Sequence, residues 1–408
     1  MDAATLAEAT EKLSRLLSPQ RTVLENGLTV VTKQDKTSGF AHIVLGTRRG
    51  GSFFGPPELF HLLEHILSVP YRNRASGADP DAETAVSRMT IAEVSVKERK
   101  FDKKLGAIVQ DLRHPAFDAL ERERGAVLVE LGEHHDDPEA FLANQFYAAC
   151  FPKSNLGRFL HEDFESVRHH LTKAILVRYW RKFFVPSNLI LSVVGEKLSH
   201  EKICEVAREL FPASDAPQPR FKRPELGRSE TTLDAPCVVV RPGLKNAYFA
   251  LGKALPRFTL KDRAVLRAVG ELLADRLNHA LRYRMGLVYG IEFNFSNTYL
   301  FNHWYIAGSC EAKHFPRVIE AVRRELGRFT VSERALTKKR ELIFEGYERI
   351  ASDPEGCAYL LYDLEVDGVN LVQYLAEFTR ITLKRARAVA ARCFSPASTV
   401  LVIVRSKP

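Results

Sequence analysis

Two stretches of the chain, far apart in the sequence, follow the same pattern, and this repeat limits the possible folds more than any other feature. Residues 171–195 and 382–404 each read as a helix, an aromatic residue, a proline and an apolar strand. At one constant offset they match at four positions: Thr172 with Thr382, Phe184 with Phe394, Pro186 with Pro396, and Leu191 with Leu401. A repeat of this kind indicates an internal duplication, and 408 residues are enough for two cores. We therefore predict an α+β fold of two similar domains, each a mostly antiparallel sheet with helices packed on one face.

Changes in composition suggest the domain boundaries. Residues 213–230 are rich in proline and charge, which is typical of a linker. Before this linker, residues 21–212 form the first predicted domain, which opens with a hairpin that turns at an Asn-Gly pair. After it, residues 231–408 form the second predicted domain. Residues 1–20 have an amphipathic pattern and are predicted to be an N-terminal helical extension.

The segment HLLEH, residues 61–65, carries the clearest chemical signal. It lies between a proline pair and Pro70, so we expect a helix of about three turns that ends near residue 69. His61 and His65 lie one above the other on one face of that helix, where two imidazoles can bind one Zn²⁺. Glu64 lies beside them and can deprotonate a zinc-bound water. This is the inverted zinc motif H-x-x-E-H; the alternative is an amphipathic helix whose solvent face happens to carry these residues.

A catalytic zinc site needs a third protein ligand, and the spacing leaves three candidates. In the helical segment 121–135, Glu123 and Glu130 are about two turns apart and share one face. One of them could bind the metal while the other orients a ligand. His134 lies one turn beyond Glu130 and is a rival ligand on spacing alone.

Charge, hydropathy and cysteines narrow the class of protein. Lys and Arg outnumber Asp and Glu by 59 to 50, but the basic residues are scattered and no nucleic-acid motif occurs, so we predict no nucleic-acid partner. No apolar run approaches the ~18 residues of a membrane helix, and the first residues lack the order of a secretion signal. We therefore expect a cytoplasmic protein that does not bind membranes. Six scattered cysteines without a C-x-x-C pair predict reduced thiols.

These motifs together resemble those of the M16 (pitrilysin-like, inverzincin) metallopeptidases, especially the short, processing-peptidase-like members. The resemblance runs from about residue 21 to the end of the chain and includes the NGL hairpin, HLLEH, ERERGAVLVE, FFVPSNLILSVVG and RYRMGLVYG. It implies that Glu130 is the third zinc ligand, that Glu123 orients a ligand, and that His134 is not part of the site.

The resemblance also implies substrate-binding residues. Arg282 and Tyr289 match an arginine–tyrosine pair that family members place opposite the zinc, where both side chains can donate hydrogen bonds to the developing oxyanion. Asp81 and Ala82 match an asparagine–alanine pair on an edge strand to which the peptide substrate adds as a further strand. The acidic residue at position 81 departs from the family pattern and disfavours acidic substrate groups nearby.

The expected function is that of a zinc metalloendopeptidase that hydrolyses peptides or unstructured protein segments. Family members enclose substrates in a chamber of four such domains, and this chain carries two, so the resemblance implies a homodimer. A heterodimer with a related subunit is the alternative assembly. The main alternative function is that of a non-catalytic structural or peptide-binding subunit, and a zinc hydrolase acting on something other than peptides is a weaker one.

Overall fold

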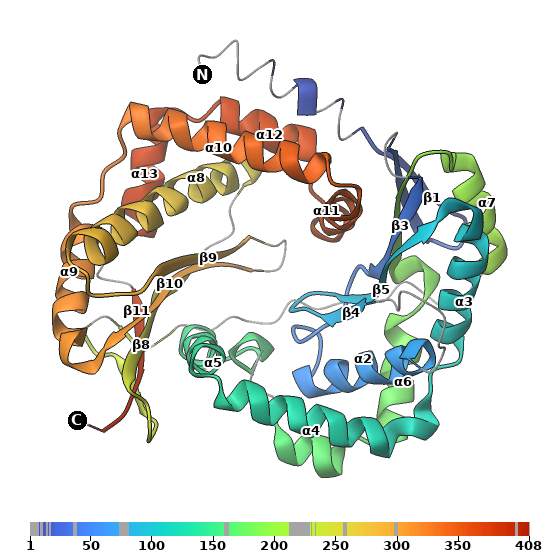
Figure 1. Cartoon of the computed structure of the whole chain (residues 1–408), viewed down its shortest axis with the longest axis horizontal. Coiled ribbons are helices and arrows are strands. Elements are labelled where there is room, and N and C mark those ends of the chain that lie inside the picture. Colours follow the sequence, from blue (N-terminus) through green and yellow to red (C-terminus); the bar gives the residue numbers. More distant parts are fainter. Residues whose placement is uncertain are drawn as a thin grey trace.

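Two sheets, one in each half of the chain, form the framework of the computed structural model (Figure 1). The structure describes residues 8, 11–13, 15, 18–35, 39–72, 81–158, 163–211, 229, 231–232, 234–255, 259–297, 301–395 and 399–407. Most of the predicted N-terminal extension, nearly all of the predicted linker, and Pro396 of the repeat lie outside these described residues.

The first sheet has six strands in the order β1-β2-β6-β3-β5-β4. The strands are β1 (Gln20–Val23), β2 (Thr29–Gln34), β3 (Phe40–Thr47), β4 (Asp81–Thr84), β5 (Met89–Lys97) and β6 (Leu189–Gly195). Only β2 and β6 pair in parallel; the other neighbours are antiparallel. The predicted hairpin is β1–β2, and it turns through Gly27, whose φ of 86° favours a residue without a Cβ.

The second sheet repeats this plan with five strands in the order β7-β11-β8-β10-β9. The strands are β7 (Cys237–Val240), β8 (Asn246–Leu255), β9 (Ile291–Asn297), β10 (Asn302–Glu311) and β11 (Val400–Arg405). Again one pair, β7 with β11, is parallel and the rest are antiparallel. The strands of the repeated stretches, β6 and β11, occupy corresponding positions, and the predicted α+β class with two similar, mostly antiparallel sheets is confirmed.

Helices follow the strands in both halves. They are α2 (Pro57–Arg72), α3 (Phe101–Arg113), α4 (Leu120–Asp136), α5 (Pro138–Cys150), α6 (Lys173–Phe183), α7 (His200–Leu210), α8 (Leu260–Leu277), α9 (Phe315–Gly327), α10 (Glu333–Ala351), α11 (Pro354–Asp367), α12 (Leu371–Thr379) and α13 (Leu383–Cys393). The matched threonines of the repeat both cap helices: Thr172 accepts a hydrogen bond from the Ile175 amide, and Thr382 accepts one from the Arg385 amide. The repeat therefore preserves the chemistry that starts α6 and α13.

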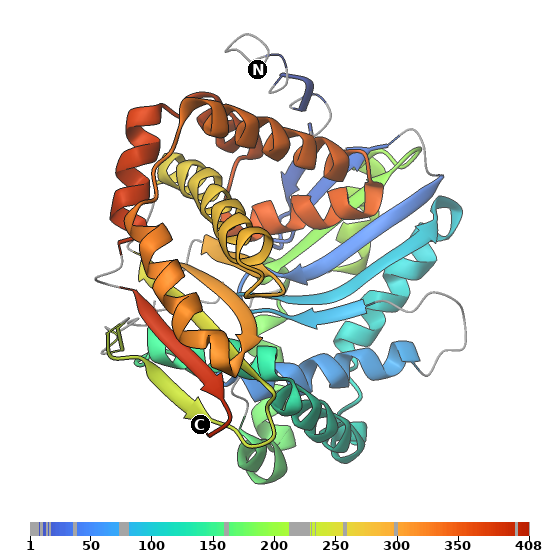
Figure 2. The ribbon, with the colours of Figure 1, turned by 60° about the vertical axis from the view of Figure 1, so that its left-hand side comes forward.

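Each sheet is covered on one face by helices of its own half and on the other face by a helix of the opposite half. On β6, Leu189, Leu191 and Val193 pack into the core with α2, α3, α6 and α7. Ile190 and Val194, which point to the other face, pack into the core that contains α11 (Figures 1 and 2). The second sheet is covered in the same way: α5 of the first half packs on the face formed by β11 and β8. Within each half, therefore, the helices lie on one face of the sheet, as predicted. The other face is covered by a helix of the opposite half, α11 on the first sheet and α5 on the second.

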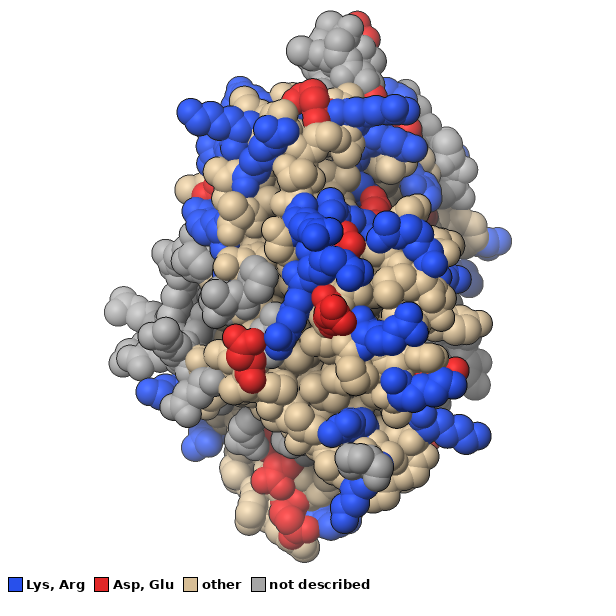
Figure 3. Space-filling view, turned by 90° about the vertical axis from the view of Figure 1, so that its left-hand side faces the viewer, with Lys and Arg blue, Asp and Glu red and all other residues tan. Residues whose placement is uncertain are grey.

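The excess of basic residues is visible on the outer surface of the second half, where Lys and Arg are more abundant than Asp and Glu (Figure 3). One contributor is α13, which carries Lys384, Arg385, Arg387 and Arg392 and no acidic residue. Within the described part of the chain, no helix is long and apolar enough to cross a membrane. All six cysteines are free thiols, as predicted, and five of them are buried.

Candidate metal centre

Helix α2 carries the HLLEH motif and is buried on almost all sides. Leu59, Leu62, Leu63 and Ile66 are at most 1% exposed and pack against the first sheet, as the periodicity predicts. His61 and His65 are also nearly buried, at 8% and 7% exposed, because their face lies against α4 rather than solvent. The predicted helix end was wrong, since α2 continues through Pro70 to Arg72. At this position the proline removes one backbone hydrogen bond of the last turn, and the helix continues for two further residues.

Three side chains from α2 and α4 converge on one point. The Nε2 atoms of His61 and His65 lie 3.1 Å and 3.3 Å from the same Glu130 oxygen, Oε2. One ligating atom from each residue can be chosen so that all three lie within 4.8 Å of one another. Atoms bound to one tetrahedral Zn²⁺ at about 2.0–2.1 Å lie roughly 3.3 Å apart, so this donor set fits zinc. The Glu130 side chain is 44% exposed, which leaves one side of the site open to solvent.

Glu123 supports the site from the buried side. Its Oε2 atom lies 3.3 Å from His65 Nδ1, and its side chain is 4% exposed. An Nδ1–H that donates to this carboxylate leaves Nε2 of His65 free to face Glu130, a common arrangement for metal-binding histidines. His134, the rival ligand on spacing, is exposed at the end of α4 and does not belong to the converging group.

Glu64 projects from α2 toward the edge strand β4. Burial raises the pKa of Glu64, and hydrogen bonds from the hydroxyl and backbone of Thr84 oppose that rise, as does the neighbouring His61. The Phe60 carbonyl oxygen, 3.2 Å from the Thr84 hydroxyl, is the alternative acceptor for its single proton. Sequence reasoning missed Thr84. The available signal was its position two residues beyond Ala82, on the same face of a strand that alternates exposed and half-buried residues.

Asp81 and Ala82 lie on β4, which is the last strand of the first sheet. Asp81 is exposed and Ala82 is half-buried. Among the described strands β4 pairs only with β5, so its other edge can offer backbone groups to a further strand. This geometry is compatible with peptide addition beside Glu64.

Arg282 and Tyr289 lie together in the second half. Arg282 belongs to the π-helical segment Asn278–Arg284 that follows α8, and its Cζ atom is 5.9 Å from the centre of the Tyr289 ring. Tyr289 is 88% exposed. Among the residues that the structure describes, no hydrogen bond or ion pair joins this pair to His61, His65 or Glu130. Both side chains of the pair are exposed to solvent.

Comparisons with known proteins show which proteins this chain resembles. A family model described as the peptidase M16 inactive domain matches residues 170–340, a segment that starts after His61, His65 and Glu130. A protein of Mycobacterium tuberculosis named as an uncharacterized zinc protease is 28% identical over 294 residues, which cover 67% of this chain and 66%, just under two thirds, of that protein.

Solved structures show the same fold over nearly the whole chain. The crystal structure of a protease from Helicobacter pylori has a TM-score of 0.83 and 18% identity, and the match covers 95% of this chain and 99% of that one. The crystal structure of a peptidase M16 inactive domain from Pseudomonas fluorescens also has a TM-score of 0.83, with 15% identity and coverage of 96% and 99%.

Proposed function

The chain belongs to the M16 peptidase family, and from that premise we propose that it is a zinc-dependent endopeptidase that cleaves peptides or unstructured protein segments. The observation that carries the proposal is the convergence of His61, His65 and Glu130 on one point, with their ligating atoms within 4.8 Å of one another. Two further carboxylates adjoin this group: Glu123 is buried behind His65, and Glu64 lies beside the histidines.

In this mechanism His61, His65 and Glu130 would hold the metal ion. Bound Zn²⁺ supplies Lewis acidity, which lowers the pKa of water and polarises a carbonyl group. Glu123 keeps the His65 ring in one orientation through its contact with Nδ1. Glu64 accepts the proton of the attacking water and delivers it to the leaving amine. Thr84 keeps the Glu64 carboxylate turned toward β4, where the peptide adds as an extended strand.

Arg282 and Tyr289 are proposed to contact the substrate carbonyl and stabilise its developing negative charge. Since the pair faces solvent in the second half of the chain, we propose that it serves the metal centre of a second copy in a homodimer. A heterodimer with a related subunit would use the same surface with a different partner.

The alternative function is a non-catalytic subunit that binds or supports another protein. The name of the matching family model, the inactive domain, favours this reading for residues 170–340. That match does not include α2 and α4, which lie before residue 170 and carry His61, His65 and Glu130.

The proposal is tested by metal analysis and by mass spectrometry of a varied library of unstructured peptides after incubation with the full chain. We expect about one zinc ion per chain and cleavage that stops with a chelator and returns with zinc. His61→Ala should lower the zinc content together with the activity. Zinc bound at full stoichiometry without any cleavage would instead support the non-catalytic alternative.

A further inference from the structure

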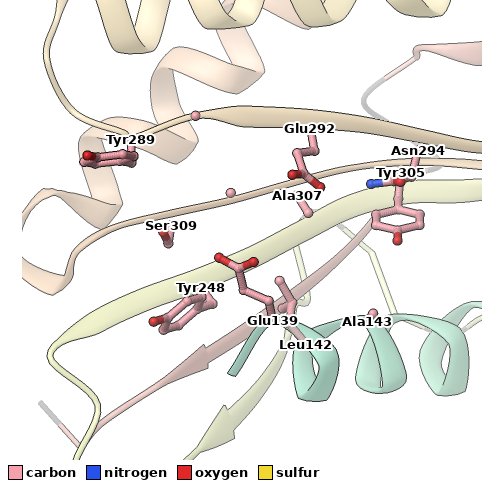
Figure 4. Close-up of a pocket in the computed structure, with 12 residues that line it drawn as sticks. Glu139, Leu142, Ala143, Tyr248, Tyr289, Glu292, Asn294, Tyr305, Ala307 and Ser309 are labelled. Atoms are coloured by element: carbon pink, nitrogen blue, oxygen red, sulfur yellow. The ribbon is translucent and has the colours of Figure 1, made fainter. Parts of the chain in front are cut away.

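Residues 278–291 present Arg282 and Tyr289, two exposed side chains whose own packing does not fix their positions. Tyr289 is 88% exposed, and its ring borders a cavity of about 250 Å³ between α5 and the second sheet (Figure 4). Arg282 is exposed as well, with its Cζ atom 5.4 Å from the ring centre of Tyr283 and 5.9 Å from that of Tyr289. A long exposed side chain keeps most of its rotamer freedom, so the backbone must set the geometry of the pair.

One side chain closes the base of this segment. Asn278 begins the π-helical stretch Asn278–Arg284, and Ile291 begins β9. The Nδ2 atom of Asn278 donates to the Ile291 carbonyl at 2.8 Å, and its Oδ1 atom accepts from the Ile291 amide at 2.9 Å. Only one orientation of the amide group satisfies both partners. Asn278 therefore ties the start of the stretch that carries Arg282 to the strand that begins two positions after Tyr289.

A buried carboxylate on α9 holds both ends of the same π-helical stretch. Glu325 is 7% exposed. Its Oε2 atom accepts from Arg276 Nε at 2.8 Å, and its Oε1 atom lies 3.6 Å from an Nη atom of Arg284. Arg276 lies just before the stretch and Arg284 is its last residue, so Arg282 lies between the two. Because a buried carboxylate is costly to leave unpaired, these contacts fix the stretch against α9.

Buried neighbours fix the backbone of the two exposed residues. Leu281 and Val288 each directly precede one of them and pack into the same core. The Leu287 amide donates to the Leu281 carbonyl at 2.9 Å, and the Gly286 amide donates to the Arg282 carbonyl at 3.1 Å. Gly286 has a φ of 61°, which a residue without a Cβ adopts at no steric cost. The turn is thus specified by its own hydrogen bonds, and its base is closed from outside the turn.

We propose that Asn278 and Glu325 are positioning residues that hold residues 278–291 in one conformation, so that Arg282 and Tyr289 meet the substrate as a preorganised pair. The proposal rests on the proposed peptidase function, to which it adds two residues that act through the pair. Donors that are already in place stabilise a developing charge without being reordered during the reaction. Opening the base of the turn should therefore lower kcat more than it raises KM.

Hydrogen exchange measured by mass spectrometry tests the positioning without any need for activity. In the full, zinc-loaded protein, Asn278→Ala should speed amide exchange in residues 282–291 roughly ten- to hundredfold, the effect of losing two hydrogen bonds, and leave α2 and α4 unchanged. Glu325→Gln should give the same local pattern. Asn370→Ala is the matched control, because Asn370 also accepts a hydrogen bond from a backbone amide, that of Gln373 in α12. It should leave residues 282–291 unchanged.

Exchange in residues 282–291 that stays at the wild-type rate in both variants overturns the proposal. An increase that is equal throughout the chain also overturns it, because the side chains then contribute only to global stability. A local increase in the two variants and not in Asn370→Ala supports it.

Kinetics with an unstructured peptide then connect the turn to the reaction. Asn278→Ala should lower kcat roughly tenfold, because small displacements of reacting groups are costly, with an unchanged zinc content and a smaller effect on KM. In a Tyr289→Phe background the same substitution should cost less, since the hydroxyl that it would misplace is already gone. Equal losses in the two backgrounds overturn the proposal. If the wild type cleaves no peptide, the peptidase function fails, and hydrogen exchange still decides whether Asn278 and Glu325 hold the turn.

Discussion

At the scale of single residues, two glutamates on one helix face have opposite surroundings, and this difference separates the roles that we propose for them. Glu123 is 3% exposed and contacts His65 from behind. Glu130, two turns further along α4, has a side chain that is 44% exposed and contacts both imidazoles. Spacing in the sequence identifies both glutamates as candidates but cannot rank them, because burial depends on the packing of α4 against α2. The resemblance to the M16 family supplied the ranking, and in the structure Glu130 faces both imidazoles while Glu123 contacts only His65.

The role of Glu64 can be tested without disturbing the metal. Glu64→Gln preserves the shape of the side chain and removes its ability to accept a proton. We expect unchanged zinc content and a loss of peptide hydrolysis of about 10²–10⁴-fold, the typical contribution of general-base catalysis. Zinc content is measured by elemental analysis and hydrolysis by initial rates. A variant with substantial remaining activity would assign the proton transfer to another group.

His303 on β10 is an independent case in which burial controls protonation. It is 1% exposed, its Nε2 atom is 3.1 Å from the Tyr147 hydroxyl of α5, and burial lowers its pKa to about 3. Between about pH 6.5 and pH 3 the unfolded chain therefore binds a proton at His303 that the folded chain does not. The contribution of this residue to stability is present above pH 6.5 and is lost as the pH falls toward 3.

We expect His303→Phe to remove this acid sensitivity. The variant loses the hydrogen bond to Tyr147, at a cost of about 1–2 kcal/mol near neutral pH. As the pH falls below about 6, the free energy of unfolding of the wild type should decrease by up to about 1.4 kcal/mol per pH unit more than that of the variant. Urea unfolding of both proteins in EDTA, at several pH values from 7 to 4, measures the difference. Parallel stability curves would contradict the assignment.

At the scale of helices and strands, local chemistry predicts most of what the structure contains. The Asn-Gly turn gives the β1–β2 hairpin, and the repeated threonines cap α6 and α13 because these signals act over a few residues. Element ends are less predictable, as Pro70 shows, because packing around α2 outweighs the cost of a proline in its last turn. The partners of each helix could not be predicted, since periodicity shows that a face is apolar but not what covers it.

One such contact joins α11 to the strands beside the metal centre. Arg88, between β4 and β5, donates hydrogen bonds to Asp363 at 2.8 Å and to the Tyr359 hydroxyl at 2.6 Å. Tyr359 in turn donates to Glu83 of β4 at 2.5 Å. The second half thereby holds the edge strand that contacts Glu64 through Thr84.

Arg88→Met should weaken this junction. Arg88 is 8% exposed, but the Asp363 side chain is 42% exposed, so solvent compensates part of the lost interaction. We expect a loss of about 1–2 kcal/mol in the free energy of unfolding, measured by chemical denaturation. Arg99→Met, at an exposed position, is the control and should change stability by less than about 0.5 kcal/mol. Equal effects of the two substitutions would show that the junction contributes no stability of its own.

At the scale of the whole molecule, the two halves depend on each other through exchanged helices. The Tyr362 hydroxyl donates to the carbonyls of Thr47 and Met89, residues that precede it by 315 and 273 positions. No local pattern in a sequence can indicate such a partner. The duplication correctly predicted two similar sheets, but nothing in the repeat showed that α5 and α11 would each pack on the other half.

The proposed homodimer has a quantitative consequence for mixed subunits. Glu64→Gln and Arg282→Ala should each be inactive alone, because each lacks one part of every site. Co-expressed in equal amounts, they should form mixed dimers in half of the cases, each with one intact site, and regain about one quarter of the wild-type activity. Glu64→Gln mixed with His61→Ala is the control and should regain nothing, since both changes affect the metal centre. Absence of recovery in the first mixture would refute sites shared between subunits.

The exchange of α5 and α11 also determines how the chain tolerates being divided. If the backbone were cut once between residues 211 and 229, each fragment would still pack against a helix of the other. We expect the two fragments to remain associated in solution. Either fragment produced alone would present a bare apolar sheet face and should aggregate, whereas the two produced together should reassemble. Recovery of function on mixing the two fragments would then report that they have associated.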